Sequence, residues 1–173
     1  MQQYTDDLLD FADDYESYDD LFGEESADAF DPQPPPRGTT QVPHFPPDGH
    51  TLSAAQRTIL NGVVRAIIAR MPTSRQFVHC AIVDVEGHED ETGDPAQFKV
   101  LGQRRAMAAA LFLAQRLQDE INKMPVADRR SVEIHTSSAG PTRPVRSNVT
   151  ERGRSFNRRV EVRFRVDTCP NVA

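Results

Sequence analysis

An acidic and a basic residue, Asp90 and Arg105, form the pair in this sequence whose types could hold a charged ligand. The head of an amino acid is a zwitterion, with an ammonium and a carboxylate a few ångströms apart. A receptor for it therefore needs one anion and one cation at matching separation. Arginine suits the cationic role because its planar fork donates two parallel hydrogen bonds to a carboxylate and stays charged. The alternative is a surface ion pair of small value, about 0–1 kcal/mol.

Two predicted elements position this pair. The nearly continuous apolar run from Phe77 to Val85 predicts a buried strand before the acid, and a turn at 93–95 precedes a helix from about Ala96 to Lys123. The cation would lie in the first turns of this helix, at the carboxyl edge of the sheet, where ligands of α/β folds commonly bind. Arg104 and Arg105 lie about 100° apart on the helix, so only one of them can face the ligand.

Three segments of the chain stand in a recognisable order. They are Val85-Glu86-Gly87-His88-Glu89-Asp90-Glu91-Thr92-Gly93, Leu101-Gly102-Gln103-Arg104-Arg105-Ala106 and Asn157-Arg158-Arg159-Val160-Glu161-Val162. Together they resemble the signature of the OmpA-like peptidoglycan-binding domain: a strand, a Gly-His-Thr-Asp turn, a helix opening with an Arg-Ala pair, and a last strand that begins Asn-Arg-Arg-Val-Glu. The resemblance covers about residues 42–166.

The resemblance implies a ligand and a role for four residues. The ligand is the diaminopimelate residue of the peptidoglycan stem peptide; Asp90 would take its ammonium and Arg105 its carboxylate, while Arg158 or Arg159 would border the pocket. No cofactor is implied. Two positions depart from the family pattern, because Glu89 replaces its threonine and Phe98 its asparagine. With Glu91, the first change adds negative charge beside the acid, which should attract an ammonium but repel a carboxylate.

The remaining elements predict an α+β two-layer sandwich of the βαβαββ type that the resemblance implies. Pro43 allows at best a short edge strand within Gly38–Phe45. The other expected elements are a helix capped by Thr51 or Ser53 and ending near Met71, strands at Ser131–Thr136 and Val160–Val166, and a loop from Ser137 to about Ser155. The domain is expected over 42–167, between a Pro-rich linker at 32–41 and a C-terminal tail at 168–173.

The charge of the chain is unevenly divided. Residues 1–31 contain 12 acidic side chains and no Lys or Arg, and the rest contains 14 acids against 20 bases, so the formal net charge of −6 is a −12 tail joined to a +6 domain. An Arg-rich domain could bind nucleic acid, but no aromatic stacking platform accompanies these arginines, so we do not expect a nucleic-acid partner.

The acidic tail carries a stripe of apolar residues at helical spacing, namely Leu8, Phe11, Tyr15, Tyr18 and Phe22. A segment with so little apolar surface and so much like charge does not fold alone. Three interpretations stay open: a solvated tail, a helix that docks on the basic domain of the same chain, and a docking peptide for another protein.

The sequence gives no sign of catalytic chemistry. It holds no phosphate loop and no nucleophile elbow, so we expect no enzyme activity. His88, Glu89 and Asp90 invite a metal site, but adjacent strand residues point to opposite faces, and we predict none. Cys80 lies within an apolar strand pattern and is interpreted as a small buried hydrophobe rather than as half of a disulfide.

Two functions from different classes follow. The first is a non-catalytic peptidoglycan-binding module in the cell envelope or periplasm. The second is a structural or adaptor component of a cell-envelope machine or a phage-like contractile injection apparatus, which would use the same scaffold for protein contacts. Residues 1–7 lack the basic start and apolar run of a secretory signal, and no run of about 18 apolar residues occurs. This favours the second function, with a cytoplasmic location or a non-Sec export route.

Overall fold

The computed structural model describes residues 38–71, 78–125 and 130–169, apart from the side chains of residues 78, 79, 168 and 169. The tail stripe and most of the linker lie outside these ranges. The elements are β1 (Thr40–Val42), α1 (Ala54–Arg70), β2 (Val78–His88), α2 (Pro95–Asn122), β3 (Ser131–Gly140), α3 (Glu151–Asn157) and β4 (Val160–Cys169). Of the described helices, none is long and apolar enough to cross a bilayer.

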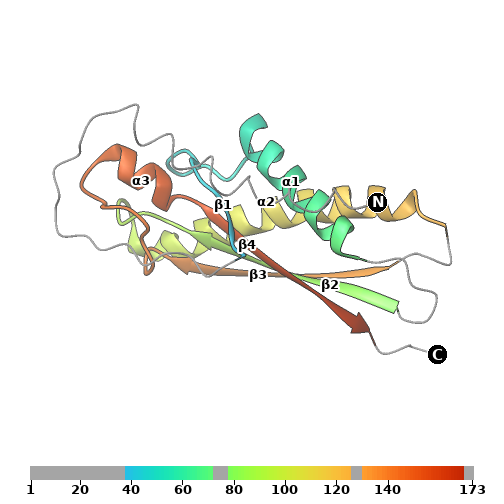
Figure 1. Ribbon diagram of the computed structural model, residues 1–173. Coiled ribbons are helices and arrows are strands. Elements are labelled where there is room, and N and C mark those ends of the chain that lie inside the picture. Colours follow the sequence, from blue (N-terminus) through green and yellow to red (C-terminus); the bar gives the residue numbers. More distant parts are fainter. Residues whose placement is uncertain (1–37, 72–77, 126–129, 170–173) are drawn as a thin grey trace. The chain divides into compact units, whose positions relative to one another are not determined.

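The four described strands form one mixed sheet in the order β1-β4-β2-β3 (Figure 1). β2 and β3 run parallel, as expected for strands joined by a helical crossover, and β4 runs antiparallel to both β1 and β2. The short β1 lies at the sheet edge, as the proline that follows it predicts. This arrangement confirms the α+β fold class.

Both long helices begin at the residues whose chemistry predicts it. α1 has a capping box, in which the Ser53 hydroxyl accepts from the Gln56 amide and the Gln56 side chain accepts from the Ser53 amide. α2 follows the Asp94 cap, with Pro95 in its first turn. α1 and α2 pack together on one face of the sheet (Figure 1). Their shared core is made of aliphatic side chains, among them Leu60, Val63, Ile67, Val83, Val85, Ala109, Leu113, Leu117, Val160 and Val162.

The backbones of β2 and α2 approach closely at two glycines. A Cβ atom added to Gly87 would lie 1.8 Å from the carbonyl oxygen of Gly102, and one added to Gly102 would lie 2.3 Å from the Ser138 hydroxyl. The carbonyl oxygen of Gly102 belongs to the backbone of α2, so it cannot rotate away as a side chain could. The spacing of β2 and α2 at this point therefore depends on the absence of a side chain, just before the strand reaches the acidic residues of interest.

We expect Gly87→Ala to lower the free energy of unfolding by about 3 kcal/mol, because α2 must move away from the sheet. Gly62→Ala is the matched control, since a Cβ at Gly62 meets its nearest neighbour, the Arg65 side chain, at 4.0 Å. Because Gly62 lies within α1, alanine at this position should leave the free energy of unfolding unchanged or raise it by up to about 1 kcal/mol. Denaturant unfolding of both variants measures the two effects, and a Gly87→Ala protein as stable as the wild type would contradict the close approach.

The prediction of a loop over residues 137–155 is wrong in part. β3 continues to Gly140, and α3 follows from Glu151 with Thr150 as its N-cap, so a short helix stands between the last two strands of the expected βαβαββ order. The missed part of β3 is the polar run Ser-Ser-Ala-Gly, which shows no apolar alternation. Asn157 orders the intervening loop, because its side-chain oxygen accepts from the amides of Val145 and Arg146. A tertiary contact of this kind leaves no local periodicity.

The interpretation of Cys80 as a small buried hydrophobe is wrong. Its side chain is half-buried and disulfide-bonded. The apolar strand pattern misled the interpretation because β2 is covered by helices on one face only, so that a residue within it need not be buried. The side chain of Cys169 lies outside the described residues.

Candidate functional site

Two acids follow directly after the end of β2. The backbone amide of His88 donates to the Arg159 carbonyl at 2.8 Å, and the amide of Glu89 donates to the Gly140 carbonyl at 3.0 Å. These bonds fix the segment between the beginning of β4 and the end of β3. The side chains of Glu89 and Asp90 are buried, with 4% and 2% exposed. Two neighbouring carboxylates in a buried position require cationic partners.

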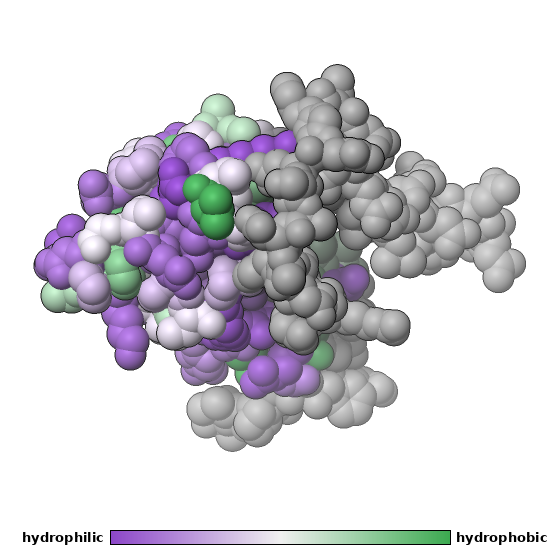
Figure 2. All heavy atoms as spheres, turned by 90° about the vertical axis from the view of Figure 1, so that its left-hand side faces the viewer, coloured by the Kyte–Doolittle hydropathy of each residue, from purple (hydrophilic) through white to green (hydrophobic). Residues whose placement is uncertain are grey.

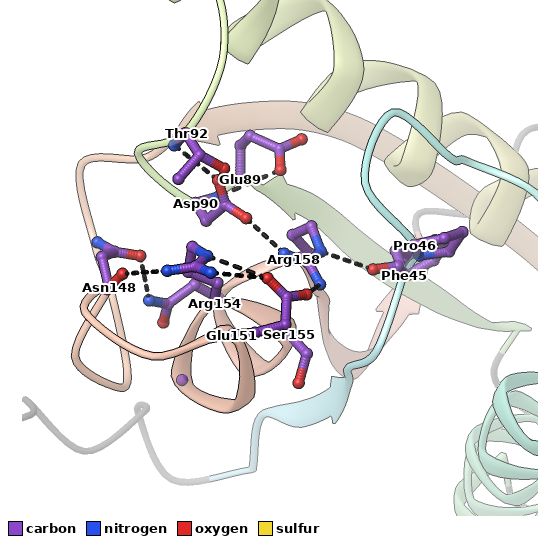
Figure 3. A network of polar contacts seen from close by, with 12 residues as sticks. Phe45, Pro46, Glu89, Asp90, Thr92, Asn148, Glu151, Arg154, Ser155 and Arg158 are labelled. Atoms are coloured by element: carbon purple, nitrogen blue, oxygen red, sulfur yellow. Dashed lines mark hydrogen bonds and ion pairs between the residues drawn. The ribbon is translucent and has the colours of Figure 1, made fainter.

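Arg158 is the partner of Asp90. Its Nη1 lies 2.6 Å from Asp90 Oδ2, its Nε donates to the Phe45 carbonyl at 2.8 Å, and its Nη2 pairs with Glu151. Figure 3 shows the guanidinium between the two carboxylates and the loop that carries Phe45. The other oxygen of Asp90 accepts from the amide and hydroxyl of Thr92, at 2.7 and 2.5 Å. Burial opposes ionisation of Asp90, but these hydrogen bonds outweigh it and lower its pKa, so the carboxylate is charged.

Arg105 is fully buried and lies about three turns into α2, deeper than the first turns predicted. Its Nη1 lies 2.7 Å from Glu89 Oε2 and donates to the His88 carbonyl at 3.0 Å. Its Nε and Nη2 donate to the carbonyls of Gly49 and Pro46, at 2.8 and 3.1 Å. The cation therefore ties the β1–α1 loop to the end of β2, and its charge is matched by Glu89.

Burial works against both charges of the Glu89–Arg105 pair. It raises the pKa of Glu89 and lowers the pKa of Arg105, and in each case the attraction of the partner reduces the shift without cancelling it. Desolvation of a buried ion pair can exceed its Coulombic gain in this way. Because a guanidinium stays protonated at any ordinary pH, the proton that neutralises the pair goes to Glu89.

A second buried group lies beside the first. His88 Nε2 lies 3.8 Å from Glu86 Oε2 and 3.7 Å from Glu161 Oε1, and neither ring nitrogen has a hydrogen-bond partner among the described residues. Burial, with the arginines at 159, 143 and 163, lowers the pKa of His88 to about 2, so the ring is neutral. Arg159 pairs with Glu161 at 2.6 Å.

The spacing of Glu86, His88 and Glu161 would suit a metal ion. The charges around them do not favour one. Glu86 pairs with Arg143 and Arg163, so three guanidinium groups, with that of Arg159, surround two carboxylates. A divalent cation would add to this surplus of positive charge.

The structure separates the four residues singled out in the sequence. Asp90, Arg105 and Arg158 lie in one cluster, since Arg105 contacts Glu89 and the Pro46 carbonyl while Arg158 contacts the adjacent Asp90 and the Phe45 carbonyl. Arg159 lies in the second group with Glu161. Arg104 is exposed, so the two adjacent arginines of α2 do face different ways.

Glu89 was predicted only as extra negative charge beside Asp90, and its pairing with the arginine of the helix was not predicted. The glutamate in place of the family's threonine was the signal that could have found it. The domain end that carries α3 and this cluster is mostly hydrophilic on its surface (Figure 2).

Comparison with known proteins agrees with these features. A model of the OmpA family matches residues 44–158. The chain is 39% identical over 79 residues to an outer membrane porin F of Pseudomonas fluorescens, covering 46% of this chain and 21% of the relative. It is 32% identical over 111 residues to the outer-membrane lipoprotein YfiB of Pseudomonas aeruginosa, covering 64% of this chain and 55% of the relative. The chain thus spans about half or less of the curated relatives it matches.

Solved structures with this fold are more distant in sequence. The peptidoglycan-associated lipoprotein of Burkholderia pseudomallei superposes with a TM-score of 0.52 at 20% identity, over 72% of this chain and 89% of the other. The C-terminal domain of Helicobacter pylori MotB superposes with a TM-score of 0.53 at 20% identity, over 74% and 85%. These likenesses show the fold. With the family model covering most of the folded domain and the three motif segments in order, the chain belongs to the OmpA family.

Proposed function

We propose that this domain is a non-catalytic module that binds peptidoglycan and anchors its protein in the cell envelope. The observation that carries the proposal is the buried cluster of Asp90, Arg105 and Arg158, which brings together one anion and two cations from three family motifs just beyond the end of β2. Family membership supports the same role, as do the names of its outer-membrane relatives. A disulfide at Cys80 also fits an oxidising compartment such as the periplasm.

The ligand that suits this cluster is the diaminopimelate residue of a stem peptide. Its ammonium would pair with Asp90 and its carboxylate with the fork of Arg105. Arg158 borders the pocket and holds Asp90 charged, whereas Arg159 supports the neighbouring strand end through Glu161. A zwitterionic head matches these groups without adding net charge to a desolvated site, because each of its charges meets the opposite one.

We expect the full chain to sediment with purified peptidoglycan sacculi, and Asp90→Asn to weaken this binding by about one to two orders of magnitude. The substitution keeps the shape of the side chain but removes the anion that a ligand ammonium needs, and a charge-assisted hydrogen bond is worth roughly 1.5–3 kcal/mol. Sedimentation with increasing protein concentration gives the affinity of each protein.

Asp119→Asn is the matched control, since it removes the same charge from an exposed position near the other end of α2. It should leave binding unchanged at physiological salt, where exposed charges are screened over about 8 Å. Equal losses in the two variants would indicate general attraction to an anionic polymer and would count against a pocket.

A second candidate function, an adaptor that contacts other proteins of an envelope or injection apparatus, draws on a different surface. α2 exposes half of Met107 and two thirds of Leu111 above a groove against the edge strand β3. An exposed apolar surface next to an edge strand of the described sheet is typical of protein contacts. Failure of the full chain to bind sacculi at any salt concentration would favour this function over the first.

A further inference from the structure

The cation expected to receive the ligand's carboxylate already holds a carboxylate of its own chain. Glu89 Oε2 lies 2.7 Å from Arg105 Nη1, and the other oxygen of Glu89 accepts the Asp90 amide at 3.2 Å. The remaining hydrogen bonds of the guanidinium go to backbone carbonyls that belong to the architecture of the domain. Glu89 is therefore the one partner of Arg105 that a ligand carboxylate could replace without dismantling a loop.

We propose that Glu89 is an intramolecular competitor for the carboxylate of the ligand, so that the site accepts a zwitterionic diamino-acid head only when Glu89 is protonated. This inference rests on the proposed function. Glu89, which stands where the family pattern has threonine, would then control when the site can bind its ligand.

The local charges support a competitor. Asp90 is matched by Arg158, and Glu151 is shared between Arg158 and Arg154. Arg105 is left with Glu89. Arg158 can hold two carboxylates because one of them, Glu151, is 60% exposed to solvent. A ligand carboxylate that arrived while Glu89 was ionised would instead place two buried anions on the fully buried Arg105, where desolvation and mutual repulsion disfavour two charged carboxylates. One of the two carboxylates must lose its charge or leave.

Glu89 is the acid of this cluster whose pKa is raised, and the neighbouring acids and His44 shift the other way. Hydrogen bonds from Thr92 and Arg158 keep the pKa of Asp90 low despite its burial, and a hydrogen bond from Arg158 lowers the pKa of Glu151. Burial and Arg158 lower the pKa of His44, in the loop over the cluster. Burial instead raises the pKa of Glu89. As the pH falls, Glu89 is thus the acid of this cluster that takes up a proton above its ordinary range, and this frees Arg105.

The test uses the full chain and isothermal titration calorimetry with a soluble stem tripeptide that ends in meso-diaminopimelate. At pH 7.5 we expect Glu89→Gln to bind this peptide about tenfold or more tightly than the wild type, a difference that corresponds to about 1.4 kcal/mol. A peptide with lysine in the last position keeps the side-chain ammonium but lacks the carboxylate beside it, and it should show no gain. Glu91→Gln, which removes the same charge from an exposed neighbour, should bind like the wild type.

A measurement without any substitution guards against a variant that fails to fold. The affinity of the wild type should rise as the pH is lowered from 7.5 to 5.5, with proton uptake seen as a dependence of the binding heat on the buffer. Glu89→Gln should show neither this rise in affinity nor this proton uptake. Any effect of His44 protonation would be the same in both proteins. Equal affinities of wild type and Glu89→Gln, or a pH-independent wild type, would overturn the inference while the proposed function stands. If neither protein binds the peptide at any pH, both fail.

Discussion

Replacing Arg158 by methionine is expected to lower the free energy of unfolding by about 3–5 kcal/mol, since removal of one partner leaves an uncompensated buried charge. The guanidinium joins three segments: the β1–α1 loop through Phe45, the end of β2 through Asp90, and α3 through Glu151. Methionine keeps the length of the side chain and its apolar stem, so the loss reports on the charge and its hydrogen bonds. Denaturant unfolding at pH 7 measures it.

The contribution of Asp90 to this network should depend on pH in one direction. The pKa of Asp90 is lowered in the folded protein, so the stabilisation is complete above the unfolded-state pKa, about 3.9, and is lost as the pH falls through the lower folded-state value.

Arg104→Met is the control for Arg158→Met, because it removes the same charge from an exposed position on α2. It should change stability by less than about 0.5 kcal/mol. Similar losses in the two variants would show that the Arg158 network contributes little.

Substituting Arg105 by alanine is expected to reduce sacculus binding by about one to two orders of magnitude, whereas Arg104→Ala should keep most of it. The lost contact is a charge-assisted one worth roughly 1.5–3 kcal/mol, and Arg104 faces away from the site. The same sedimentation assay compares the two variants at equal salt. Equal losses would argue for nonspecific attraction and against a pocket.

Arg105 also holds the carbonyls of Pro46 and Gly49, so alanine at this position should weaken the domain as well as the site. Arg105→Lys separates the two effects, because lysine keeps a cation for Glu89 but lacks the planar fork that a carboxylate prefers. We expect it to remain folded at the assay temperature, as judged by far-ultraviolet circular dichroism, and still to lose binding. A lysine variant that binds like the wild type would show that the site needs a charge and no fork.

Local patterns predicted the elements whose signals lie within a few residues. The predicted cap at Thr51 or Ser53 proves to be Ser53, and the helix predicted from about Ala96 begins at Pro95. These boundaries and the alternation from Val160 to Val166 depend on hydrogen bonds or periodicity that a short window contains. α3 was missed because seven residues give less than two full turns of pattern. Its position depends on contacts between Asn157 and a loop about ten residues earlier.

Sequence patterns were sufficient to assign the fold class, the edge position of β1 and the placement of Arg105 rather than Arg104 on the buried side of α2. These follow from periodicity, from the missing amide of proline and from the resemblance of three motifs. Tertiary structure alone decided how the charges pair. Asp90 meets Arg158, 68 positions away, and Arg105 meets Glu89, while Arg159 turns to Glu161. Pairing of buried charges depends on distance and desolvation in three dimensions, and spacing along the chain encodes neither.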